Sequence, residues 1–129
     1  AAIGAGCVQD LSGKRGPYAP EWSATAYANY ERPLGDNLVL RLNMDAAYKD
    51  DYYLDGDLDP NTQQDSFVKL NGLVGIGSQD GTWEISLYGR NLTDETTYSF
   101  AVDAPLSAGI YGAWAEEPRI LGLQARYNF

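Results

Sequence analysis

The chain has 129 residues, the length of one domain or of a piece of a larger one, with a formal net charge of -9 and a pI near 4.2. So acidic a chain is not expected to bind nucleic acid or anionic lipid through charge. It has no His and no nucleophile-base set, so we expect neither an enzyme nor a bound cofactor. It also lacks a run of about 18 apolar residues, so no transmembrane helix is expected.

Five segments alternate apolar and polar residues with the period of two that is typical of β-strands. In chain order they are residues 21–32, 37–49, 66–78, 82–88 and 119–129. The fourth is expected to run on towards Tyr98, with a bulge near Arg90 to Leu92, where the alternation blurs. Ten Tyr and fourteen Gly also favour strands and turns over helices. The sequence therefore predicts an all-β chain, an antiparallel up-and-down meander of about five strands.

The connections between these segments alternate in length. Residues 33–36 and 79–81 read as tight turns, the second through its Asp-Gly pair. Residues 50–65 and 99–117 read as long loops, and residues 1–20 as the end of a third long loop. In a meander this order places the tight turns at one end of the sheet and the long loops at the other.

The two faces of the predicted sheet differ in chemistry. One carries Ala, Leu, Val, Ile and Met, whereas the other carries the charged and amide side chains of Arg41, Asp45, Lys69, Glu84, Gln124 and Arg126. In a soluble sandwich or barrel the apolar face packs inward. In an outer-membrane barrel it contacts lipid, and the polar face lines the lumen.

Aromatic residues favour the membrane interpretation. On the apolar face Tyr30, Trp83, Tyr127 and Phe129 are expected near the tight turns, and Trp22 and Tyr48 near the long loops. Two girdles of rings that flank an aliphatic band are typical of a membrane interface. Predicted strands of about 11–13 residues also suit a tilted span, which needs about 9–11.

Four phrases resemble those of TonB-dependent outer-membrane receptors. Residues 13–23, centred on Ala19-Pro20-Glu21-Trp22, resemble the family's loop-to-strand transition, and residues 83–95, with Asn91-Leu92-Thr93-Asp94, resemble its penultimate strand. Pro118 to Leu123 resembles the beginning of the last strand, and Tyr127-Asn128-Phe129 the terminal signature. Their order and spacing cover nearly the whole chain.

The resemblance implies that residues 1–129 are the carboxyl-terminal fragment of a 22-stranded transmembrane β-barrel in the bacterial outer membrane, without the plug domain and TonB box that lie upstream. Such receptors import a scarce ligand: an iron chelate such as a siderophore, cobalamin or a glycan. The implied partners are outer-membrane lipid, the ligand, the inner-membrane TonB energy-coupling complex (through the absent plug) and the outer-membrane insertion machinery. That machinery would read Tyr127 and Phe129 as an assembly signal, although both rings would also serve as anchors at the interface.

Two other classes stay open. A passive porin or another outer-membrane barrel would share the same terminal strand, and a soluble β-barrel binding protein would bury the apolar face. A plug domain upstream separates the receptor from the porin, and dependence on detergent separates both from the soluble binder.

The acidic loop is a candidate metal site. Asp55, Asp57 and Asp59 have the alternate spacing of a calcium loop, but Pro60 stands where an EF-hand needs Gly and no Glu occupies position twelve. A solvated acidic loop is the competing interpretation and the favoured one.

Ligand contacts are expected from rings on or beside the long loops: Tyr52, Tyr53, Tyr98, Phe100, Tyr111 and Trp114. The same rings would equally hold the loops together by packing on one another. The charges of the polar face, Arg90 among them, are expected to pair across strands or to bind the plug rather than the ligand. In particular, Glu84 and Arg126 are expected within pairing distance. Cys7 is either an inert small residue or half of a disulfide with a partner upstream.

Overall fold

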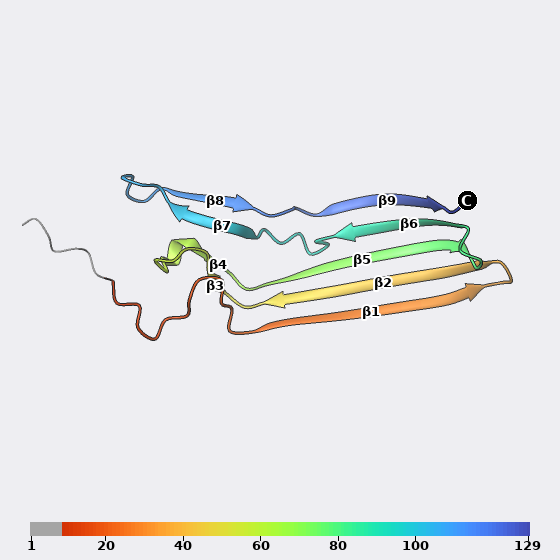
Figure 1. Ribbon diagram of the computed structural model, residues 1–129, viewed down its shortest axis with the longest axis horizontal. Coiled ribbons are helices and arrows are strands. Elements are labelled where there is room, and N and C mark those ends of the chain that lie inside the picture. The colour runs from red at the N-terminus through yellow and green to blue at the C-terminus, as the bar shows by residue number, and fades with distance from the viewer. Residues whose placement is uncertain (1–8) are drawn as a thin grey trace, which may run out of the picture.

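Five long strands form a single antiparallel sheet in the computed structural model, which describes residues 9–129. They are β1 (Ser23–Leu34), β2 (Leu38–Lys49), β5 (Phe67–Ser78), β6 (Trp83–Arg90) and β9 (Ile120–Tyr127). Each pairs with the next long strand along the chain, in the order β1-β2-β5-β6-β9 (Figure 1). The predicted all-β meander is therefore confirmed. Cys7 lies outside the described residues.

The other elements are short and lie at the end of the sheet opposite to the tight turns (Figure 1). They are β3 (Tyr52–Tyr53), the 3-10 helix η1 (Pro60–Thr62), β4 (Gln63–Gln64), β7 (Tyr98–Asp103) and β8 (Tyr111–Ala115). β3 pairs with β4 and β7 with β8, so each of the two long loops contains a small antiparallel pair. No helix among residues 9–129 is long and apolar enough to cross a membrane.

The register confirms the predicted division into two faces, because residues directly opposite each other share a face. One cross-strand row consists of Tyr30, Leu42, Val74, Leu87 and Leu123. The next row consists of Glu31, Arg41, Gly75, Ser86 and Gln124. The first row belongs to what we call the apolar face and the second to the polar face.

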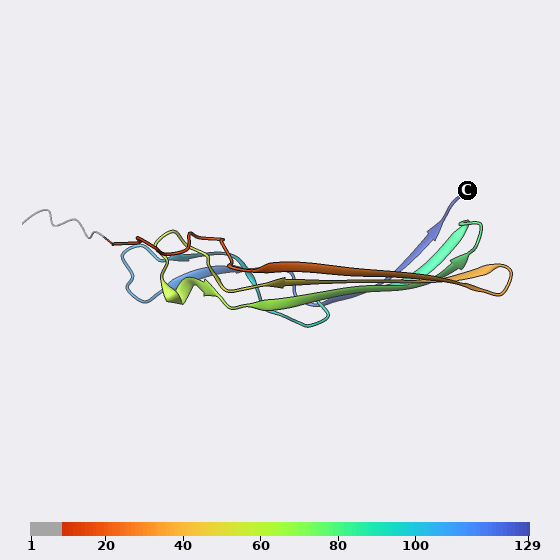
Figure 2. The same cartoon turned by 90° about the horizontal axis from the view of Figure 1, so that it is seen from below.

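The sheet is a single layer, so all 12 residues of β1 are exposed on both faces, whereas on the inner strands the polar face is more covered than the apolar face. Figure 2 shows the layer edge-on, with its β6 and β9 side curling away at the tight-turn end. On the polar face Val39 and Ser86 are each 3% exposed, whereas Ile85 and Leu87 on the apolar face are 48% and 58% exposed. Residues on the concave side of a curved sheet cover one another, so we infer that the polar face is the concave one.

The expectation that the fourth strand continues towards Tyr98 is wrong. β6 ends at Arg90, and residues 91–97, which we call the break segment, separate it from β7. Asn91 and Asp94 have positive φ angles of 50° and 59°, a left-handed conformation that cannot continue a strand. The blurred alternation near Asn91 therefore marks the end of the strand rather than a bulge.

Glycines on β5 allow β5 and β6 to approach closely. A Cβ atom added to Gly77 would lie 2.6 Å from the carbonyl oxygen of Trp83 on β6, and a clash with backbone cannot be relieved by a side-chain rotation. On the same face, a Cβ at Gly122 of β9 would overlap the ring of Tyr88, which lies over this glycine. The first contact lies near the tight-turn end of the sheet and the second near the loop-cap end.

We predict that Gly77→Ala destabilises the sheet, because the new methyl group forces the two strands apart. The expected loss is about 1–3 kcal/mol in the free energy of unfolding, the usual cost of overpacking. Denaturant unfolding of the full-length protein measures it. Gly56→Ala is the matched control, since a Cβ there meets nothing within 4 Å. Equal stability of the two variants would contradict the close contact.

Candidate functional site

The long connections form a folded unit that we call the loop cap, made of residues 9–22, 50–66 and 91–118. Its core is a cluster of Tyr52, Leu54, Phe67 and Ala101, with Tyr98 packed against it. Phe67 is the first residue of β5, so the cluster joins the loop cap to the sheet. Within residues 9–129, four of the six buried hydrophobic side chains belong to this cluster. The long loops are thus packed together. The candidate metal-binding and ligand-binding residues all lie in or beside this loop cap.

The structure brings together part of the predicted metal site. Carboxylate oxygens of Asp57, Asp59 and Asp103 lie within 4.8 Å of one another. Asp55 is not in this group, and its carboxylate accepts a hydrogen bond from the backbone N–H of Gly56 at 2.6 Å. The alternate spacing was therefore a guide to only two of the three carboxylates, and the third comes from β7.

Asp103 differs from the other two carboxylates in its surroundings. One of its oxygens, Oδ1, is buried without a hydrogen-bond partner among the described residues. Burial raises the pKa of Asp103, and the neighbouring charges of Asp57 and Asp59 raise it further. Asp59, in contrast, has donors: its Oδ1 accepts from the backbone N–H and the side-chain amide of Asn61, both at 2.8 Å. Three carboxylates of this kind suit a hard cation such as Ca²⁺ in ligand type, but they occur equally in acidic surface loops.

The six candidate ligand-binding rings do not form one site. Tyr52 and Tyr98 belong to the packed cluster, so they hold the loops together, and Tyr52 also contacts Tyr18 with ring centroids 6.3 Å apart. Tyr53 is tied to the leading segment, because its carbonyl accepts from the N–H of Tyr18 at 2.8 Å. The hydroxyl of Tyr111 accepts a bond from Asn61 at 3.0 Å, beside the acidic group.

Phe100 and Trp114 are the most exposed of the six rings, at 43% and 59%, and Tyr111 is exposed at 39%. They are cross-strand partners on the β7-β8 hairpin, with ring centroids 5.4 Å apart. The next pair along the hairpin is Ala101 with Ala113, and Ala101 faces the cluster. Since neighbouring pairs point to opposite sides of a hairpin, Phe100 and Trp114 point away from the core of the loop cap.

Asn91 organises the break segment, and the sequence analysis assigned it no site role. Its backbone N–H donates to Oδ1 of Asn71 at 2.9 Å, and its side-chain amide donates to the carbonyl of Glu95 at 2.9 Å. Its own Oδ1 accepts from the N–H of Glu95 at 3.0 Å. Asn91 is almost fully buried, and these bonds fix the position at which the chain leaves β6. The signal in the sequence was the loss of alternation at this residue.

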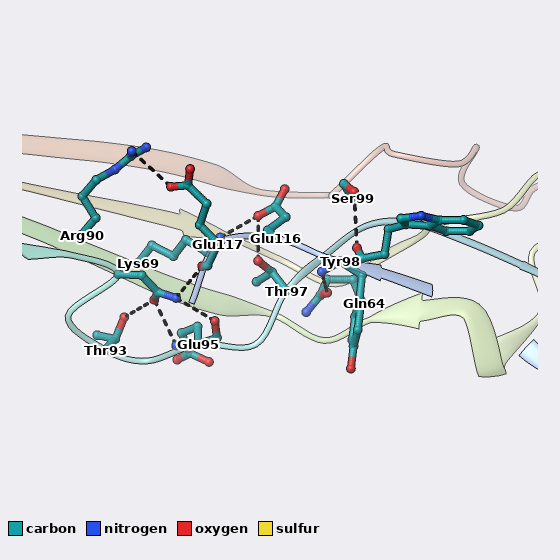
Figure 3. A network of polar contacts seen from close by, with 12 residues as sticks. Gln64, Lys69, Arg90, Thr93, Glu95, Thr97, Tyr98, Ser99, Glu116 and Glu117 are labelled. Atoms are coloured by element: carbon teal, nitrogen blue, oxygen red, sulfur yellow. Dashed lines mark hydrogen bonds and ion pairs between the residues drawn. The ribbon is translucent and has the colours of Figure 1, made fainter. Parts of the chain in front are cut away.

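An ion pair between Lys69 and Glu116 connects the loop cap to the sheet (Figure 3). Lys69 of β5 donates to Oε2 of Glu116 at 2.6 Å, and the hydroxyl of Thr97 donates to the same oxygen at 2.7 Å. The hydrogen bond from Lys69 lowers the pKa of Glu116 most, followed by the bond from Thr97, against a smaller opposing effect of burial. Glu116 therefore stays ionised to lower pH than an ordinary Glu and holds β7 and β8 against β5.

Charges on the polar face pair with one another, as the sequence predicted for Glu84 and Arg126, whose side chains are 3.8 Å apart. A shorter bond was not predicted: Arg41 of β2 donates to Glu84 of β6 at 2.6 Å and to Glu31 of β1 at 3.1 Å. The complete set, which we call the ion-pair row, is Glu31, Arg41, Glu84 and Arg126. Arg41 reaches Glu84 across β5 because Arg41 lies opposite Gly75 and Glu84 opposite Gly77, where no side chain intervenes.

The other predicted polar-face charges also have partners. Asp45 accepts from Asn71 at 2.7 Å, and Arg90 pairs with Glu117 at 3.1 Å. Together with Lys69 and the ion-pair row, each charge of this set has a partner within the chain. A partnered charge is a poor ligand contact, because the ligand would have to displace the partner.

The aromatic residues of the apolar face lie mostly at its two ends. Trp83 pairs in register with Tyr127 at the tight-turn end, and Tyr127 contacts Phe129 edge-on with centroids 5.2 Å apart. Tyr48 lies opposite Ala24 at the loop-cap end, where Trp22 immediately precedes β1. Tyr30 differs from expectation: it occupies the row of Leu42, in the middle of the face rather than at its rim.

Comparison with known proteins gives no match: no protein-family model, no curated protein and no solved structure matches the chain. The resemblance to the receptor family therefore stays a prediction, and the function has to rest on the geometry of the sheet and the loop cap.

Acid should loosen the β7-β8 hairpin through Glu116. Because the pKa of Glu116 is depressed in the folded state, its ion pair contributes fully above the ordinary value of 4.5 and is lost as the pH falls below it. We predict faster hydrogen exchange of the amides of residues 98–115 at low pH, and fast exchange already at neutral pH in Glu116→Gln. Glu117→Gln is the control, since its ion pair is exposed on both sides. Equal exchange in the two variants at pH 7 would contradict the role of Glu116.

For the acidic group we predict that Asp103→Asn raises the melting temperature at pH 7 without divalent cations, because it removes repulsion from Asp57 and Asp59. Since the pKa of Asp103 is raised, protonation relieves the same repulsion in the wild type, so the advantage shrinks as the pH falls. Asp36→Asn, in a tight turn, is the control for net charge. If the group binds calcium, calcium will stabilise the wild type and Asp103→Asn will lose that response. A variant less stable than wild type in chelator would overturn the repulsion.

Proposed function

We propose that this chain is the carboxyl-terminal part of the β-barrel of an energised outer-membrane receptor, which imports a scarce ligand such as an iron chelate, cobalamin or a glycan. One observation carries the proposal: the long sheet is a single layer that exposes the Leu, Ile and Val side chains of its apolar face. A soluble protein would reverse this arrangement, because apolar side chains are stabilised by leaving water.

The free energy of burying apolar side chains indicates whether lipid or water contacts the apolar face. Burying one Leu-sized side chain contributes about 1.5–3 kcal/mol. The apolar face exposes many such side chains, with Leu121 and Leu123 at 72% and 70%. Leaving all of them in water would cost more than the 5–15 kcal/mol by which a domain is usually stable. Lipid removes this cost without requiring a second protein layer.

Strand dimensions support a transmembrane position. β1, β2 and β5 have 12 residues each, which suffices for a tilted strand to cross the hydrocarbon core. On the proposed lumen side, the ion-pair row satisfies its charges within the chain. The tight turns would then be periplasmic and the loop cap extracellular.

Choice of a receptor over a passive porin is supported by the four phrases of the sequence and by the packed loop cap. The proposed partners are outer-membrane lipid, the insertion machinery that would read Tyr127 and Phe129, the ligand, and the inner-membrane TonB complex acting through a plug outside this chain. The barrel closes when β1 and β9, whose outer edges are open here, pair with further strands.

A matched pair of substitutions tests the lipid contact. Leu123→Arg places a charge on the apolar face, and Gln124→Arg places the same charge on the polar face one residue away. In a membrane the first costs up to about 2–4 kcal/mol and the second little. We expect less folded full-length protein in the outer-membrane fraction for Leu123→Arg alone, as seen by heat-modifiable migration in gels. Normal folding of Leu123→Arg, or a protein that needs no detergent, would favour the soluble binder.

Transport separates the receptor from the porin. A strain that lacks the full-length gene is grown on candidate iron chelates, cobalamin and glycans as limiting nutrients. We expect a growth defect on one class, and the same defect when the inner-membrane energy-coupling complex is inactivated. Uptake that persists without that complex would identify a passive porin.

A further inference from the structure

A polar cleft lies in the loop cap, lined in part by Phe67 and Tyr98 of the hydrophobic cluster. It lies between residues 63–67, where the chain enters β5, and residues 94–98 at the end of the break segment. Its volume is about 400 Å³, within the range of roughly 300–1,000 Å³ that is usual for ligand pockets. Because both walls are tied to the packed cluster through Phe67 and Tyr98, the cleft is a fixed feature of the loop cap.

The wall of the cleft offers hydrogen-bond acceptors and no cation. Asp65, Asp94 and Glu95 line it. Asp94 pairs with Arg119 at 3.1 Å, whereas the side chains of Asp65 and Glu95 have no hydrogen-bond or ion-pair partner within residues 9–129. The hydroxyls of Ser66 and Thr96 also line it, whereas none of its lining residues is Lys or Arg. An anionic ligand would be repelled, and a ligand with several hydroxyl donors would find acceptors on both walls.

Tyr98 adds an apolar surface to this polar wall. Its backbone N–H donates to Oε1 of Gln64 at 2.9 Å, a bond that links the two walls and sets the position of the ring. Figure 3 shows Glu95 and Tyr98 pointing to the same side of the chain, away from Arg90 and Glu117. A carboxylate and an aromatic ring on one side present a hydrogen-bond acceptor next to an apolar surface.

We infer that this cleft binds a neutral sugar ring. A pyranose has hydroxyl donors around its edge and an apolar C–H face, which match the carboxylates and the ring of Tyr98 respectively. The sugar belongs either to a free glycan or to the glycan of a lipid, and the cleft recognises the same chemistry in both. The inference rests on the proposed function only in that it places the loop cap outside the cell.

The test uses the full-length protein in detergent on an array of neutral and acidic glycans. The wild type should retain neutral glycans and no acidic ones. Glu95→Gln and Asp65→Asn should each raise the dissociation constant of the best neutral glycan about tenfold. This is the loss of affinity expected when one charge-assisted hydrogen bond is removed. Glu117→Gln removes the same charge from the opposite side of the chain and should leave binding unchanged. No retained neutral glycan, or equal losses in all three variants, would overturn the inference.

A second arm distinguishes the two sources of the sugar. The wild type in nanodiscs with and without bacterial glycolipid is titrated with the best free glycan. Competition by the glycolipid assigns the cleft to lipid, and unchanged affinity assigns it to the free glycan. Failure of this inference differs from failure of the proposed function, because the proposed function fails when the protein does not fold in the outer membrane, whatever it binds.

Discussion

One constraint governs this structure: its long sheet is a single layer, and within residues 9–129 no second layer packs on its apolar face, which only Leu92 of the break segment contacts, at Gly72 and Gly89. A sheet of this kind is stable only when another medium or another layer takes up that face. The proposed lipid contact satisfies the constraint, and it explains why the polar face is concave and why the strands are long. Sheet length, face chemistry and curvature are thus consequences of one requirement.

The polar face requires that its charges be neutralised, since they lie close together on one surface. Neutralisation occurs within the chain: Arg41 lies between Glu31 and Glu84, and Arg126 follows on β9. Gly75 and Gly77 are needed because a side chain on β5 would stand between Arg41 and Glu84. The ion-pair row therefore depends on two residues without side chains, and it links β1, β2, β6 and β9 across β5.

The long acidic connections would repel one another if nothing held them together, and contacts within the loop cap hold them. Residues 50–65 contain six Asp and neither Lys nor Arg. A small hydrophobic cluster, the bonds of Asn91 and the Lys69–Glu116 ion pair hold this segment and the β7-β8 hairpin in place. The result is a fixed outer surface on which both the acidic group and the polar cleft are built.

Sequence alone determined the five long strands, their faces and the placement of tight turns, because side-chain alternation and turn residues such as Gly35 and Gly81 act over a few neighbours. It did not predict the short strands inside the long loops. It also located Asp57 and Asp59, but not the contribution of Asp103, which lies more than forty residues away. The bond from Arg41 to Glu84 and the walls of the cleft were decided by tertiary structure alone, and only the structure shows that the blurred alternation at Asn91 is the end of a strand. Each depends on the register between strands or on the packing of the loop cap. The alternation of side chains along one segment of sequence carries no information about either.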